Sequence, residues 1–138
     1  MENSINFLIL IPSIPLFMSL VIFILLRTFN RTVNRLTKPA SYLTLFSILF
    51  PTVLSSFYLY NNVEGQIYLS NYLSIFQGSN LEFHLNSMTE KLIILLGIII
   101  SLVIIFSLIK LPRKTGYVLY IVNLGFLTAF SLSILLFI

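Results

Sequence analysis

The side chains able to do acid–base chemistry in the middle of the chain are few. Glu90 and Lys91 are adjacent and stand directly before a long apolar stretch, and His84, the only histidine, lies shortly before them. One hypothesis makes Glu90 a proton-handling carboxylate at the mouth of a pathway, because ionisable groups in a membrane are costly and usually serve a function. The interpretation we favour is an interfacial pair, Glu90 and Lys91, whose side chains extend to water.

Metal and haem chemistry has little support in the sequence. His84 has no Cys or Asp nearby, the chain contains no Cys at all, and one histidine cannot supply both ligands of a bis-histidine haem. Asn30-Arg31-Thr32 matches the glycosylation pattern, but it lies beside basic residues and we interpret the match as accidental. We expect no catalytic, cofactor-binding or metal-binding residue in this chain.

The composition identifies the solvent that surrounds the protein. Of the 138 residues, 58% are apolar and 9% are charged, and the mean hydropathy is +1.03. Soluble domains have roughly 25% charged residues, and disordered chains combine low hydrophobicity with high charge. Both classes are excluded, which leaves an integral, multi-pass membrane protein. The net charge of +4 does not indicate nucleic-acid binding, because the basic residues lie in short gaps between apolar stretches.

Four apolar stretches are long enough to cross a bilayer, which takes about 20 helical residues. They cover residues 7–26, 41–60, 92–109 and 117–138, and none contains Asp, Glu, Lys, Arg or His. Only a helix satisfies every backbone group of a lone span in lipid. The sequence therefore predicts an all-α fold, a single membrane domain over residues 1–138 with four transmembrane helices. The long outer loop, 61–91, contains two extended segments around a turn at 77–80, which predicts a small β-hairpin over 67–85.

The charges predict the orientation. Two gaps between spans carry the basic residues Arg27, Arg31, Arg35, Lys38, Lys110, Arg113 and Lys114. The loop 61–91 instead carries one Lys and three Glu. Basic residues favour the cytoplasmic side of a membrane. We therefore expect both termini and the long loop on the non-cytoplasmic side of a bacterial inner or thylakoid membrane.

Small and polar residues within the spans predict helix packing. Gly125, Ala129 and Ser133 recur every four residues and leave a groove for a neighbouring helix. Asn123 would be costly in lipid and should face a neighbouring helix. Small or polar residues also follow one side of the second span, at Thr44, Ser47, Pro51, Thr52, Ser55 and Ser56. The tyrosines near the span ends are expected to anchor the helices at the interface, at Tyr42, Tyr58, Tyr60, Tyr117 and Tyr120.

Several short motifs, in this order, resemble a known family. They are Leu10-Ile11-Pro12-Ser13-Ile14-Pro15-Leu16 at the first span, Gly78-Ser79-Asn80 followed by Glu82-Phe83-His84-Leu85 in the loop, and Gly116-Tyr117-Val118 at the fourth span. The chain resembles the N-terminal portion of the antiporter-like membrane subunit five of NAD(P)H–quinone oxidoreductase, the complex I type of respiratory membranes, cyanobacteria and chloroplasts. Two positions depart from that family, since Leu119 stands where an Arg is usual and the basic Lys110 region replaces an acidic step. The family's proton-conducting Glu and Lys would lie beyond Ile138, so no pumping residue is carried over.

The resemblance implies a non-catalytic membrane subunit, or a truncated paralogue, of a proton-translocating NAD(P)H–quinone (or plastoquinone) oxidoreductase. Its partners would be membrane lipids and other membrane subunits, with no nucleic acid. Quinone and NAD(P)H would bind elsewhere in the parent complex. The alternative is a stand-alone scaffold or assembly factor of another membrane or photosynthetic complex. A third hypothesis, a small oligomeric transporter, is weakened by the lack of ionisable residues in the spans.

Overall fold

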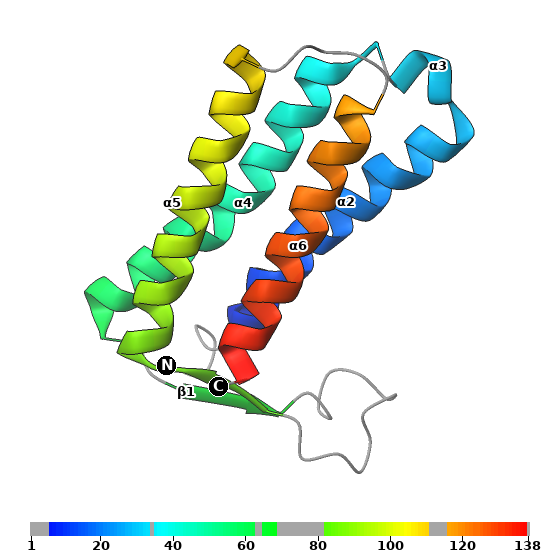
Figure 1. Cartoon of the computed structure of the whole chain (residues 1–138). Coiled ribbons are helices and arrows are strands. Elements are labelled where there is room, and N and C mark those ends of the chain that lie inside the picture. The colour runs from blue at the N-terminus through cyan, green and yellow to red at the C-terminus, as the bar shows by residue number, and fades with distance from the viewer. Residues whose placement is uncertain (1–5, 34, 63–64, 69–81, 111–115, 138) are drawn as a thin grey trace.

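Four long helices dominate the fold (Figure 1). The computed structural model describes residues 6–33, 35–62, 65–68, 82–110 and 116–137. The long helices are α2 (Leu10–Thr28), α4 (Thr37–Asn61), α5 (Ser87–Lys110) and α6 (Tyr117–Phe137), and two short helices, η1 (Asn6–Ile9) and α3 (Asn30–Val33), flank α2. The predicted all-α bundle is confirmed.

All four long helices are long and apolar enough to cross a membrane. They contain 19 to 25 residues, which corresponds to about 28 to 38 Å at the usual rise per residue, against a hydrocarbon core of about 30 Å. Two of them extend beyond the predicted spans because their polar ends are also helical. Helix α4 begins at Thr37, with Pro39 in its first turn, where proline is tolerated. Helix α5 begins at Ser87.

The helices run alternately up and down, so each end of the bundle gathers distinct residues (Figure 1). At one end lie the strands, the start of α5 and the end of α6, and we call this the sheet end. At the other end lie α3, the last turn of α2 with Arg27 and the last turn of α5 with Lys110, and we call this the basic end. The most extensive contacts join α4 to α5 and α2 to α6. Helix α4 also contacts α2 and α6, and α6 also contacts α5, so α4 and α6 each pack against the three other long helices.

A two-stranded antiparallel sheet interrupts the helical order. Strand β1 (Gly65–Tyr68) pairs with β2 (Glu82–Leu85), with Gly65 opposite Leu85 and Tyr68 opposite Glu82. The second extended segment of the predicted hairpin is thus a strand. The first strand begins slightly earlier than the predicted 67–76, and the predicted turn at 77–80 lies outside the described residues.

The bundle places large apolar side chains outside and small polar ones inside. Phe46, Val53 and Ile109 are about two thirds or more exposed. Apart from Glu90 and two tyrosines, the buried polar side chains among the described residues are all Ser or Thr. An apolar exterior of this extent would be unfavourable in water but suits lipid. The distribution agrees with a membrane-spanning bundle.

Candidate functional site

The first turn of α5 is fixed by reciprocal hydrogen bonds. The Asn86 N–H donates to Thr89 Oγ1 at 2.8 Å, and the Thr89 hydroxyl donates to the Asn86 carbonyl, also at 2.8 Å. The Glu90 N–H donates to the same carbonyl at 3.0 Å. Such pairs satisfy backbone groups that the start of a helix leaves open. They fix where α5 begins, and Glu90 lies in this first turn.

Glu90 is buried, so its interpretation as a residue that extends to water is wrong. Only 1% of its surface is exposed. The cause is its register, because Glu90 is at the start of the buried side of α5, which continues through Ile93, Gly97, Ser101 and Ile104. A carboxyl at this position is favoured by the helix N-terminus, but its burial is costly unless it is compensated. Ile93 and Gly97, three and seven positions after Glu90, lie on the same side of the helix. This spacing could have indicated from the sequence that Glu90 is buried.

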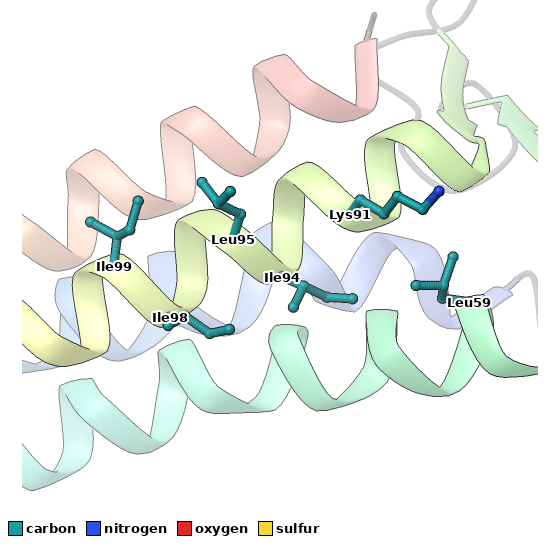
Figure 2. A pocket seen from close by; sticks show the side chains of 6 residues that line it. All are labelled: Leu59, Lys91, Ile94, Leu95, Ile98 and Ile99. Carbon is teal, nitrogen blue, oxygen red and sulfur yellow. The ribbon is translucent and has the colours of Figure 1, made fainter.

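Lys91, the next residue, is exposed as expected and borders a groove on the outside of the bundle (Figure 2). The groove has a volume of about 510 Å³. Its lining is otherwise aliphatic, with Leu59 from α4 and, from α5, Ile94, Leu95, Ile98 and Ile99. In Figure 2 the Lys91 ammonium points along α5 toward the sheet end, away from the isoleucines. Glu90 and Lys91, neighbours in one turn of α5, thus face the interior and the outside of the bundle, respectively.

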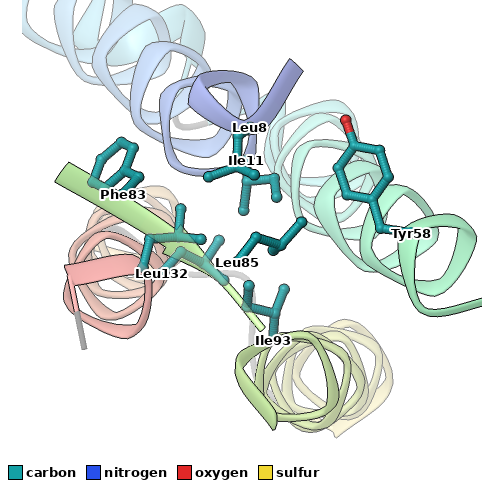
Figure 3. Packing of buried hydrophobic residues seen from close by; sticks show 8 residues of the cluster. Leu8, Ile11, Tyr58, Phe83, Leu85, Ile93 and Leu132 are labelled. Carbon is teal, nitrogen blue, oxygen red and sulfur yellow. The ribbon is translucent and has the colours of Figure 1, made fainter. Parts of the chain in front are cut away.

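Strand β2 lies across the sheet end of the bundle (Figure 3). Phe83 and Leu85 of this strand are buried, and the Phe83 ring lies 4.8 Å from that of Phe137, between centroids. The cluster that they join contains Leu8, Ile11, Tyr58, Ile93, Leu132 and Leu136. Tyr58 is therefore a core residue, and its prediction as an interfacial anchor is wrong. His84 lies between the two buried residues and pairs with Gln66 of β1.

Tyr117 differs from its prediction in the same way at the basic end. Its side chain is buried, and its hydroxyl oxygen lies 3.3 Å from that of Ser41. Tyr117 follows Gly116, whose φ of 99° ends the preceding connection and lets α6 begin. The other tyrosines, Tyr42, Tyr60 and Tyr120, are exposed as expected of interfacial anchors.

The buried hydroxyls of the interior are satisfied mainly by their own helices. The Ser41 and Thr44 hydroxyls donate to the Thr37 and Ala40 carbonyls at 2.9 Å. The same pattern continues at Ser19, Ser47, Thr52, Ser107 and Thr128. A hydroxyl bonded in this way can be buried in a helix interface without a partner on another helix. The pattern indicates packing rather than a chain of hydroxyls that hand protons to one another. The predicted polar side of α4 is confirmed except at Ser56, which is exposed.

Two glycines allow the closest helix approaches. A Cβ added at Gly97 of α5 would overlap the Thr52 methyl of α4, and one added at Gly125 of α6 would overlap the Ser19 hydroxyl of α2. Gly125 and Ala129 are buried, so the predicted groove on the fourth span is confirmed at these positions. Gly97 was not predicted, although Ser101 follows it at the same four-residue spacing that indicated the groove on the fourth span, and both residues are buried.

Asn123 faces outward, although we expected it to face a neighbouring helix of the chain. Its side chain is exposed on a side of α6 that also carries Leu119, Tyr120, Leu127 and Phe130. No hydrogen bond of the Asn123 amide is found among the described residues. The rotation of α6 is set instead by Gly125 and the neighbouring Val122, which are buried. The bundle therefore exposes one amide within an otherwise apolar helix face.

The chemistry that these residues could support is limited. No group of three or more His, Cys, Asp or Glu side chains that could hold a metal ion occurs in the described part of the chain. The structure places His84 in β2 and Glu90 in the first turn of α5. What the bundle offers is a buried carboxyl, a cation beside an apolar groove and an exposed amide. No protein-family model and no curated protein matches the chain.

Proposed function

We propose that the chain is a non-catalytic membrane subunit that packs by helix–helix contacts in a proton-translocating NAD(P)H–quinone oxidoreductase. The observation that supports a subunit is the exposed Asn123 on α6. An amide facing lipid loses the hydrogen bonds that it makes with water, at a cost of several kcal/mol in a purely apolar medium. A polar group on a neighbouring protein helix removes this cost. Large apolar side chains around Asn123 supply the rest of such a contact.

The identity of the complex rests on the sequence resemblance. Pro12 and Pro15 lie at the start of α2, and Gly116-Tyr117 forms the step into α6. These are the positions that the motifs have in the membrane subunit five of the complex I type. Quinone and NAD(P)H would then bind to other subunits, and the proton-conducting residues would belong to them as well. Membrane lipids and neighbouring subunits would be the partners of this chain.

The proposed orientation places the basic end at the cytoplasm or stroma and the sheet end on the opposite side of a bacterial inner or thylakoid membrane. The support is the positive-inside rule, together with the gathering of Arg27 and Lys110 at one end. Because the chain has no cysteine, single cysteines report the topology cleanly. In intact cells, Ser87→Cys should react with an impermeant maleimide and Leu36→Cys should not; the reverse labelling would contradict this orientation.

Deletion of the chain tests the function itself. Membranes that lack it should show loss of the assembled oxidoreductase on a native gel and a lower rate of NAD(P)H-dependent quinone reduction, and the intact gene should restore both. Unchanged assembly and rate would contradict the proposal. Co-migration of the tagged chain with a different membrane complex would support the scaffold alternative instead.

Burial of Glu90 favours a second candidate function, proton handling by an oligomer of this chain. A carboxyl enclosed by the bundle could accept and release a proton at the entrance to α5. Liposomes that contain only this chain would then dissipate a pH gradient, and Glu90→Gln would slow the dissipation while Glu64→Gln, a carboxyl of the loop, would not. Liposomes that hold the gradient as well as protein-free vesicles would exclude this candidate.

A further inference from the structure

The groove beside Lys91 has the form of a binding site for an amphipathic ligand. Its lining from Ile94 to Ile99 is entirely aliphatic, and Leu59 of α4 completes it. From Lys91 to Ile99 it follows α5 for about 12 Å at the usual rise per residue. It lies on the exposed side of two helices that are long and apolar enough to cross a membrane. A hydrocarbon chain lying along α5 would therefore be in its natural surroundings there.

Lys91 gives the groove one charged end. The ammonium points toward the sheet end of the bundle (Figure 2), where α5 begins. Glu90 does not accompany it at the surface, because that side chain is buried on the other side of the helix. Among the described residues, no ion pair or hydrogen bond of Lys91 is found. A cation at the level of the headgroups attracts an anion.

We propose that the groove binds an anionic phospholipid, with an acyl chain against Ile94 and Ile98 and the phosphate at the Lys91 ammonium. A phospholipid matches both parts of the groove, whereas inorganic phosphate would leave the aliphatic lining unused. A helix of another protein would cover Lys91 and would need its own acid to compensate the buried charge. A lipid leaves the ammonium at the interface and needs no such partner. The proposal requires only that α4 and α5 span the membrane, so it stands independently of the complex to which the chain belongs.

Spin-labelled lipids test the headgroup selectivity. The full chain is reconstituted in phosphatidylcholine vesicles with trace spin-labelled phosphatidylglycerol or phosphatidylcholine, and the immobilised fraction of each label is measured. We expect phosphatidylglycerol to be preferred, and Lys91→Gln to lower its relative association constant about fivefold, as expected for one basic residue near the membrane surface. Lys91→Arg should retain the preference, and Lys110→Gln, which removes a cation at the basic end without a groove beside it, should lower it less than Lys91→Gln does. No preference in the unaltered chain, or a loss on Lys91→Gln no larger than that on Lys110→Gln, would overturn the proposal.

A second pair of variants tests the acyl-chain site. Ile98→Trp fills the groove and should reduce the immobilised phosphatidylglycerol, whereas Val53→Trp, on an exposed position of α4 outside the groove, should not. Equal effects of the two tryptophans would overturn the proposal. So would chemical cross-linking that shows a dimer of the chain which Ile98→Trp disrupts, because the groove would then hold a second copy rather than a lipid.

Discussion

The two glycine contacts of the bundle look alike but differ in what surrounds them. At Gly97 an added Cβ would meet the Thr52 methyl, and the Thr52 Cβ would lie at 3.2 Å. At Gly125 it would meet the Ser19 hydroxyl, with the Ser19 Cβ also at 3.2 Å. Threonine is β-branched and its χ1 is restricted to two rotamers in a helix, of which the 2.6 Å hydrogen bond to the Leu49 carbonyl holds one at Thr52, whereas a serine has only its hydroxyl to move away. The α4–α5 contact is therefore rigid, and the α2–α6 contact can yield.

Gly97→Ala should give the largest loss of stability. Because Thr52 cannot turn aside, the helices α4 and α5 must separate, and overpacking of this kind typically costs about 1–3 kcal/mol. We expect a loss near the upper end of this range in the free energy of unfolding, measured by detergent titration with circular dichroism. Gly97→Ala together with Thr52→Ser, which removes the methyl and keeps a hydroxyl for the Leu49 carbonyl, should recover most of the loss. A double variant as unstable as Gly97→Ala would contradict the rigid contact.

Gly125→Ala should cost less, about 1 kcal/mol, because the Ser19 hydroxyl can rotate at the expense of its 2.7 Å hydrogen bond to the Pro15 carbonyl. Adding Ser19→Ala should restore part of the stability, since the overlapping oxygen is then absent. The same titration measures both variants. If Gly125→Ala proved more harmful than Gly97→Ala, the comparison between the two contacts would be reversed.

A third glycine separates the effect of space from that of backbone conformation. Gly116 has a φ of 99°, but no atom lies within 4 Å of an added Cβ. Gly116→Ala should therefore cost about 1 kcal/mol through the left-handed backbone alone. No second substitution of a neighbouring side chain should restore it, in contrast to Gly97→Ala. As the matched control, Thr52→Ser combined with Gly116→Ala should be no more stable than Gly116→Ala alone.

The smallest effect is expected where two helices meet without a glycine. The Ser41 hydroxyl has both the Thr37 carbonyl and the Tyr117 hydroxyl within reach, at 2.9 and 3.3 Å. Interhelical hydrogen bonds in membranes average about 0.6 kcal/mol. A double-mutant cycle of Ser41→Ala and Tyr117→Phe should give a coupling energy of this size. A coupling above about 2 kcal/mol would show that hydroxyl pairs, rather than close packing, dominate the bundle.

These contacts also show what could be predicted from the sequence. The four spans follow from the length of the apolar stretches, and the Gly125 contact follows from the four-residue spacing of Gly125 and Ala129. Gly97 and Ser101 have the same spacing, so a close approach at Gly97 could have been predicted as well, but nothing in its local sequence indicates that the partner is Thr52. Its close approach depends on the pairing of α4 with α5, which only the tertiary structure defines.

The remaining differences between the predicted and the observed exposure depend on which side of each helix faces the interior of the bundle. Glu90, Tyr58 and Tyr117 stand near the ends of the spans, where the average polarity of the sequence favours exposure. Their burial follows from the side of the helix on which they lie and, for Tyr58, also from strand β2, whose Phe83 and Leu85 pack in the same cluster. Asn123 is the opposite case, since it was predicted to face a neighbouring helix but is exposed. Gly125 and Val122 are buried on the other side of α6, so this amide points outward.

Asn123→Leu, compared with the unaltered chain in native membranes, separates the interior of the bundle from its proposed outer contact. We propose that the bundle holds itself together through its interior, while Asn123 contacts another membrane subunit. The unaltered chain should then migrate on a native gel with NAD(P)H–quinone reductase activity. Asn123→Leu should migrate apart from it and should unfold in detergent at the same denaturant concentration as the unaltered chain. An Asn123→Leu chain that stays in the active band, or an unaltered chain that never enters it, would contradict this proposal.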